Sequence, residues 1–107
     1  MEIKELTQRA NEIKKMYSRM EMDKFGKVWT DAQVMQGFVV DVGELMELFM
    51  AKEGIREIEN VDEKISHELA DCLYCILVLA GRLGIDMEKE FIKTMDGLES
   101  RLEKYKE

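Results

Sequence analysis

The 107-residue chain contains no proline, a single histidine, only two cysteines and no run of basic residues. Proline interrupts helices, so its absence permits long uninterrupted ones. Nine methionines and the charged and aliphatic content favour the same structure. We therefore predict one all-α domain over residues 1–107, large enough for a modest core.

The missing basic and apolar runs exclude several classes of partner. A formal net charge of −7 argues against binding a nucleic acid polymer through a positive patch. The longest apolar run, residues 72–81, is too short to cross a membrane, and the charged N-terminal stretch lacks the apolar core of a signal peptide. We expect a cytoplasmic protein that would need a metal ion to bind a polyanionic substrate.

The two cysteines, Cys72 and Cys75, form a C-x-x-C pair inside an apolar segment. One such pair without a second is weak support for a zinc or redox site. Free cysteines are commonly buried, so we interpret both as ordinary buried thiols and expect no disulfide.

Apolar residues recur at spacings of three and four along four segments, which predicts four amphipathic helices. We expect them at residues 2–22, 31–52, 61–83 and 87–104. The pairs Thr30/Gln33 and Asn60/Glu63 resemble capping boxes at the second and third starts. The predicted protomer is four-helix bundle-like. Because the third segment is apolar nearly all round between residues 69 and 80, we expect a dimer or tetramer that covers it.

Two acidic pairs interrupt the second and third segments, Glu44-x-x-Glu47 and Glu68-x-x-Asp71. Residues three apart share a helix face, and Asp41 extends the first set by one more step. Carboxylates against a core are costly unless a cation neutralises them. Mg²⁺ or Mn²⁺, which prefer oxygen ligands, are the natural candidates, so we predict a metal cleft between these helices.

Four other side chains have two interpretations each. Trp29, in the predicted loop at residues 23–30, either plugs one end of the bundle or stacks on a ligand ring. Lys64 and Arg82 lie on the face of the second acidic pair, where ion pairing within the helix is favoured over phosphate contact. His67 is expected on the surface or at an interface.

Three motifs resemble the MazG-like nucleoside triphosphate pyrophosphohydrolases, especially the small single-domain type that includes the dCTP pyrophosphatases. They are VGELMEL at residues 42–48, ELADCLY at 68–74 and GID at 84–86, and the resemblance covers about residues 25–101. It implies an all-α dimer or tetramer that hydrolyses (d)NTPs to monophosphate and pyrophosphate with Mg²⁺, in nucleotide-pool clearance.

The resemblance also implies roles for single residues. The metal ligands would be Glu44, Glu47, Glu68 and Asp71, with Glu44 or Glu47 also serving as the catalytic base. Asp41 stands where the family often has glutamate; it is one methylene shorter and is left out of the ligand set. The substrate-binding residues would be Trp29, Gln33, Lys93 and Arg101.

The last helix departs from the family pattern. Thr94 stands where many members have lysine, Leu98 replaces an asparagine, and only Arg101 matches. This departure motivates an alternative: a catalytically weak helical oligomer that binds a nucleotide or a protein partner. A di-iron carboxylate bundle is a further alternative, but such sites use Glu-x-x-His pairs and this chain has none.

Overall fold

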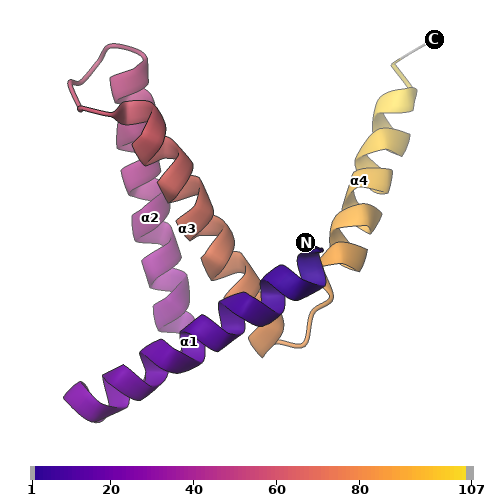
Figure 1. Cartoon of the computed structure of the whole chain (residues 1–107). Helices are drawn as coiled ribbons and strands as arrows, with labels where there is room; N and C mark the ends of the chain where they lie inside the picture. Colours follow the sequence, from indigo (N-terminus) through magenta and orange to yellow (C-terminus); the bar gives the residue numbers. More distant parts are fainter. Residues whose placement is uncertain (1, 106–107) are drawn as a thin grey trace.

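The computed structural model describes residues 2–105 and contains four α-helices, with no strand in that range (Figure 1). The helices are α1 (Ile3–Phe25), α2 (Asp31–Lys52), α3 (Val61–Arg82) and α4 (Met87–Glu103). The predicted all-α class and the four expected segments are confirmed. None of these helices has both the length and the apolarity needed to cross a bilayer.

The starts of α2 and α3 are built differently. At α2 the predicted capping box is present, because Gln33 N donates to Thr30 Oγ1 at 3.2 Å and Thr30 N donates to Gln33 Oε1 at 2.9 Å. At α3 the predicted capping box is wrong. Asn60 has a left-handed backbone, with φ of 56°, and makes no side-chain cap. A capping side chain normally reaches the first turn from an extended backbone, which Asn60 lacks.

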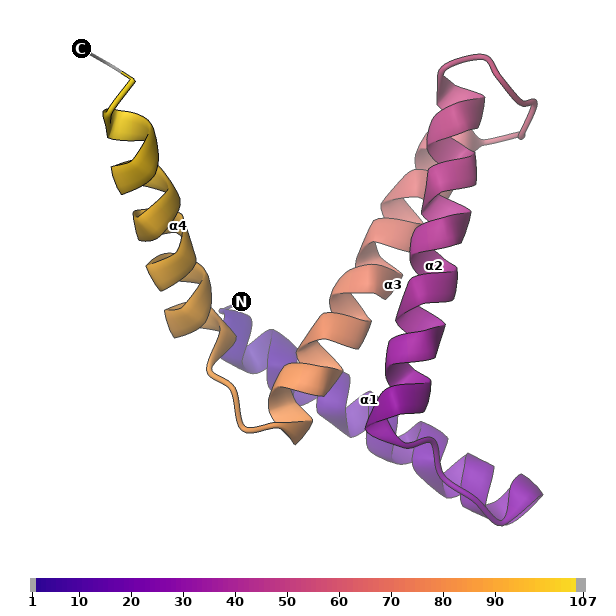
Figure 2. The ribbon, with the colours of Figure 1, turned by 180° about the vertical axis from the view of Figure 1, so that it is seen from behind.

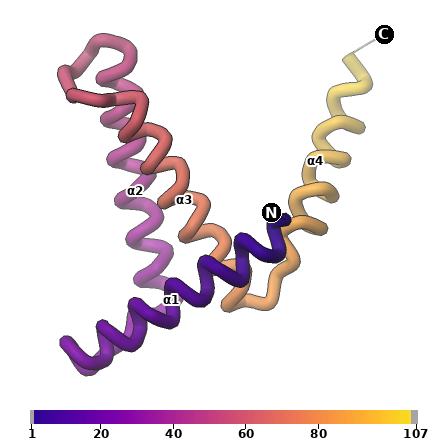
Figure 3. Tube along the Cα trace, in the orientation of Figure 1, coloured from indigo at the N-terminus to yellow at the C-terminus, as the bar shows by residue number. Residues whose placement is uncertain are grey.

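The helices α2 and α3 run antiparallel, side by side, and α1 crosses their lower end (Figure 3). Ala10 of α1, Val34 of α2, and Leu77 and Val78 of α3 form the buried cluster at this crossing. Val78 is fully buried, with 0% of its surface exposed. The crossing therefore joins three of the four helices into one core.

A polar contact sets the close approach of α1 to α3. Asn11 Nδ2 donates to the backbone oxygen of Leu77 at 3.2 Å and to that of Thr7 at 2.9 Å. Gly81 lies under the same carboxamide, and a Cβ at this position would overlap it. Glycine at residue 81 therefore leaves room for the Asn11 carboxamide, which a larger side chain would displace.

The helix α4 leaves this core and forms a V with the α2–α3 pair (Figures 1 and 2). It has no buried residue, and only its start lies beside the first turns of α1. The radius of gyration is 17.3 Å, against about 13 Å for a compact domain of this length. Four helices are thus present as expected, but among the described residues of the chain only three of them share a core.

Candidate metal centre

Three carboxylates converge between α2 and α3. One oxygen each from Asp41, Glu44 and Glu68 lies within 4.8 Å of the other two. Asp41 and Glu44 are adjacent on one side of α2 because they are three residues apart. Glu68 meets them from α3, which runs antiparallel beside α2. We call this set the three-acid cluster.

Glu68 is the most perturbed member of the three-acid cluster. Its Oε2 atom is buried and has no hydrogen-bond partner within residues 2–105. Burial raises the pKa of its carboxyl group, and the negative charges of Glu44, Asp71 and Asp41 raise it further. Both effects disfavour the carboxylate, and a bound divalent cation would offset both. The three-acid cluster therefore fits a hard cation with oxygen ligands.

Two of the acids predicted as ligands face other partners. Asp71 Oδ2 lies 3.2 Å from His67 Nε2, one turn earlier on α3. Glu47 Oε1 lies 3.7 Å from Arg56 Nη1, in the connection between α2 and α3. The structure thus brings Glu44 and Glu68 together as predicted. Glu47 and Asp71 would have to leave these partners to bind the same ion.

Asp41 belongs to the three-acid cluster, although the family resemblance did not include it among the metal ligands. The signal was present in the sequence: Asp41 continues the three-residue spacing of Glu44 and Glu47, in a helix without lysine before residue 52. Its shorter side chain suffices because it lies on the side of α2 that meets α3. There the thiol of Cys75 contacts Asp41 Oδ2 at 3.8 Å.

Both cysteines are free and buried, as predicted. Burial, followed by the charge of Asp41, raises the pKa of Cys75 to about 11. Burial also raises the pKa of Cys72. Each group is therefore a neutral thiol at physiological pH, and Cys75 can donate its proton to Asp41. Because the thiolate is the reactive form, this pair is poorly suited to redox or zinc chemistry.

A pocket of about 500 Å³ opens beside the three-acid cluster. Glu44, Glu47 and Glu68 line its acidic side, and Lys64 and His67 bring nitrogen atoms to its wall. Lys64 forms no ion pair within residues 2–105, so the predicted pairing within the helix is absent. The pocket therefore combines carboxylates for a cation with an available ammonium for an anion.

Arg82 has a different role from Lys64. Its guanidinium is ion-paired with Asp31 at the start of α2, so the pairing joins two helices instead of lying within one. This contact lies near the opposite end of α3 from Lys64, at the last turn of the helix. Arg82 therefore connects α2 and α3 through an ion pair that lies away from the pocket.

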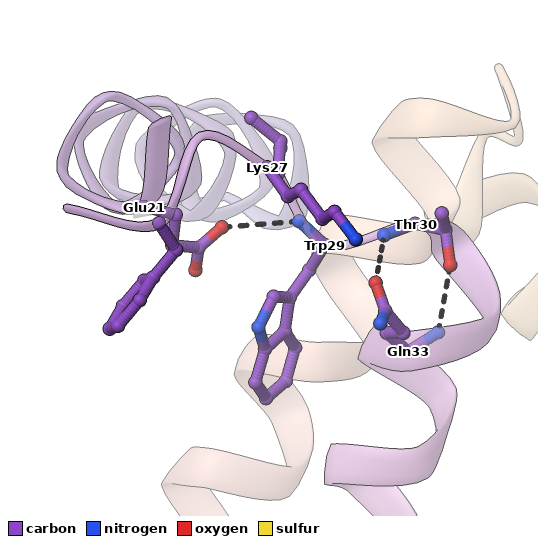
Figure 4. A pocket seen from close by; sticks show the side chains of 7 residues that line it. Glu21, Lys27, Trp29, Thr30 and Gln33 are labelled. Carbon is purple, nitrogen blue, oxygen red and sulfur yellow. Dashed lines mark hydrogen bonds between the residues drawn. The ribbon is translucent and has the colours of Figure 1, made fainter. Parts of the chain in front are cut away.

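Trp29 and Gln33 line a second pocket, between the end of α1 and the start of α2 (Figure 4). The side chain of Gln33 is used in the capping box, and the ring of Trp29 packs on Gly37 of α2 while staying half exposed. The buried carboxylate of Glu21 accepts the backbone N–H of Trp29 at 3.2 Å.

The second pocket is remote from the three-acid cluster. Eleven residues of α2 separate Gln33 from Glu44, which corresponds to about 16 Å along the helix axis. Lys93 and Arg101 lie on the exposed helix α4, on the other arm of the V. Within this chain the four predicted substrate-binding residues are therefore not gathered around the acids.

Comparison with family models, curated proteins and solved structures finds no match for this chain.

Proposed function

We propose that this protein is a Mg²⁺-dependent hydrolase that cleaves (d)NTPs to (d)NMP and pyrophosphate. The observation that carries the proposal is the three-acid cluster, in which a buried oxygen of Glu68 lacks a partner and two further carboxylates lie within 4.8 Å. Supporting it are the motifs at residues 42–48 and 68–74, which resemble those of the nucleoside triphosphate pyrophosphohydrolases and contain Glu44 and Glu68.

Asp41, Glu44 and Glu68 would hold the cation, with Mn²⁺ as a substitute for Mg²⁺. Bound Mg²⁺ would offset the charge of the triphosphate oxygens and polarise the phosphorus. A chain with a formal net charge of −7 needs such a bridge to bind a polyanion. The three acids act as ligands rather than as bases, because each oxygen bound to a cation is a weaker proton acceptor.

Glu47 is then the candidate general base. It lines the pocket, it lies one turn beyond Glu44 on α2, and it stands outside the three-acid cluster. Its contact with Arg56 is long, at 3.7 Å, and both side chains are about half exposed. Glu47 can therefore release Arg56 at little cost and orient a water molecule for in-line attack.

Lys64 and Arg56 are the candidate phosphate-binding groups, in place of Lys93 and Arg101. Lys64 lines the pocket without an ion-pair partner among the described residues, and Arg56 becomes available once Glu47 turns to the attacking water. The ammonium of Lys64 on the wall of the pocket and the guanidinium of Arg56 beside Glu47 would neutralise phosphate oxygens that face away from the metal.

The test is pyrophosphate release from a panel of NTPs and dNTPs with Mg²⁺. The wild type is compared with Glu68→Gln, Asp41→Asn and Glu47→Gln, and with Glu59→Gln, an exposed carboxylate outside the pocket, as the matched control. We expect turnover of one or a few nucleotides. Loss of turnover is expected in the first three variants and not in the control.

Measuring Mn²⁺ binding by electron paramagnetic resonance distinguishes the metal ligands from the general base. Glu68→Gln and Asp41→Asn should weaken Mn²⁺ binding, whereas Glu47→Gln should retain the metal but lose turnover. If all four variants keep the wild-type rate, the three-acid cluster is not the site of catalysis and the proposal fails.

The alternative, a catalytically weak oligomer that binds nucleotides, has one observation in its favour: Lys93 and Arg101 lie on α4, away from the acids. It predicts that nucleotides bind with Mg²⁺ but release no pyrophosphate. Calorimetric titration with a non-hydrolysable triphosphate, run beside the turnover assay, distinguishes the two functions.

A further inference from the structure

The thiol of Cys75 reaches the three-acid cluster from α3. Its sulfur lies 3.8 Å from Asp41 Oδ2 on α2, and the two atoms form a hydrogen bond. A thiol is a weak donor, and an ionised carboxylate accepts hydrogen bonds at both oxygens. Because Cys75 is only 8% exposed, water has little access to compete for this proton. Cys75 therefore holds one oxygen of Asp41 at the contact between the two helices.

Asp41 has few other groups to hold it in the cluster. The side chain is half-buried, and no lysine, arginine or histidine among the described residues forms an ion pair with it. The charged groups that approach it are the carboxylates of Glu44 and Glu68, within 4.8 Å. Like charges at this distance repel one another. Without a cation, the hydrogen bond from Cys75 opposes the repulsion that would turn Asp41 out of the cluster.

The second thiol of α3 provides an internal comparison. Cys72 and Cys75 are both free, and each is 8% exposed. Of the two, Cys75 is the one whose thiol forms a hydrogen bond with an acid of the cluster. Substituting Cys72 therefore removes an equally buried sulfur without removing that hydrogen bond.

We infer that Cys75 is a positioning residue of the metal centre, whose thiol holds the Asp41 carboxylate turned towards Glu44 and Glu68 before a divalent cation binds. The thiol is not itself a ligand, because hard cations prefer oxygen. A group that hydrogen-bonds to a metal ligand typically changes metal affinity by about 10–100-fold. The inference rests on the metal site of the proposed function, but it does not depend on the hydrolysis.

The first test is the Kd for Mn²⁺, measured by electron paramagnetic resonance on variants that circular dichroism shows to be folded. Cys75→Ala should raise the Kd by about tenfold, because Asp41 loses its donor. Cys75→Ser keeps a donor at this position and should recover most of the affinity. Cys72→Ala, the matched control, should change the Kd by less than about threefold. Equal Kd values for Cys75→Ala and Cys72→Ala would overturn the inference.

The second test measures the hydrogen bond directly by infrared spectroscopy of the S–H stretch, in protein without metal. Cys72→Ala and Cys75→Ala assign the two thiol bands of the wild type. The Cys75 band should move to higher frequency in Asp41→Asn, since a carboxamide accepts more weakly than a carboxylate, and should stay in place in Glu47→Gln. Saturating Mg²⁺ should move it in the same direction. A Cys75 band that Asp41→Asn leaves unchanged would show that the thiol donates elsewhere and would refute the positioning role.

Failure of this inference and failure of the proposed hydrolysis give different results. If Cys75→Ala weakens Mn²⁺ binding but the wild type releases no pyrophosphate, the hydrolysis fails and the positioning role stands. If the wild type turns over nucleotides while Cys75→Ala and Cys72→Ala bind Mn²⁺ equally well, the positioning role fails and the hydrolysis stands. A wild type that binds no Mn²⁺, with or without a non-hydrolysable triphosphate, would overturn both.

Discussion

The helices α3 and α4 are both amphipathic, yet the structure uses them in opposite ways. Six residues of α3 are buried, and α3 carries Glu68, Asp71 and both thiols. The helix α4 has no buried residue, and its apolar side chains are all at least 39% exposed except for Met87 at its start. Amphipathic spacing therefore shows which face of a helix is to be covered, but not whether the cover comes from the same chain.

The position of each helix in the connectivity explains the difference. The helix α3 lies between α2 and α1 and packs on both of them. The helix α4 follows a short turn in which Gly84 has a left-handed backbone, with φ of 69°, and only its first residues contact α1. Within the described residues, no helix packs along the length of α4.

The largest expected contrast between the two helices is in catalysis. If the proposed hydrolysis holds, Glu68→Gln on α3 should lower kcat/KM for the preferred nucleotide by at least about 100-fold, because it removes a proposed metal ligand. Lys93→Ala on α4 should lower it by less than about threefold, since Lys93 lies outside the three-acid cluster and its pocket. Steady-state pyrophosphate release measures both. Equal losses in the two variants would place α4 in the active site.

The next contrast is in stability. Val78→Ala in the buried cluster on α3 should lower the free energy of unfolding by about 2 kcal/mol. Phe91→Ala on α4 should cost less than about 0.5 kcal/mol at concentrations where the chain is monomeric, since the ring is mostly exposed. Urea titrations at low and high protein concentration give both values. The cost of Phe91→Ala should rise with concentration if α4 packs on a partner.

Substitutions of one glycine on α3 and one on α4 test the difference in packing between the two helices, with smaller expected changes in stability. Gly81→Ala should destabilise the protein by about 1–2 kcal/mol, because the new methyl group displaces the carboxamide of Asn11 from Leu77. Gly97→Ala should stabilise it by up to about 1 kcal/mol, since nothing lies within 4 Å of the new methyl group and alanine favours helix. Thermal unfolding of the two variants should shift in opposite directions.

The smallest expected effect is a pH dependence of folding stability that is caused by Glu68 on α3. The pKa of Glu68 is raised in the folded protein, so between pH 4.5 and that raised value the folded state binds more protons than the unfolded state. Without divalent metal, this group therefore makes stability fall as pH rises through that range. Glu68→Gln should flatten the fall, and saturating Mg²⁺ should reverse it. Urea midpoints across pH 4–8 measure the slope, with Glu99→Gln on α4 as the matched control.

Much of the site followed from residue type and spacing. Acids three apart within apolar segments predicted that carboxylates of the second and third helices converge, and Glu44 and Glu68 do lie together. However, spacing shows only which side chains share a helix face. It does not show which of them reach the contact between two helices. Asp41 joins the cluster because it lies at the contact of α2 and α3, while Glu47 and Asp71 face Arg56 and His67.

The sequence by itself determined the elements of this protein: four helices, their boundaries to within about three residues, the capping box at Thr30 and the buried thiols. These features depend on neighbours within a few residues along the chain, which a sequence displays directly. Only the tertiary structure decided that three helices share a core while α4 stands apart, and that Asn11 lies over Gly81. Those outcomes depend on crossing angles and turn geometry, and such geometry is set by contacts between residues far apart in the chain.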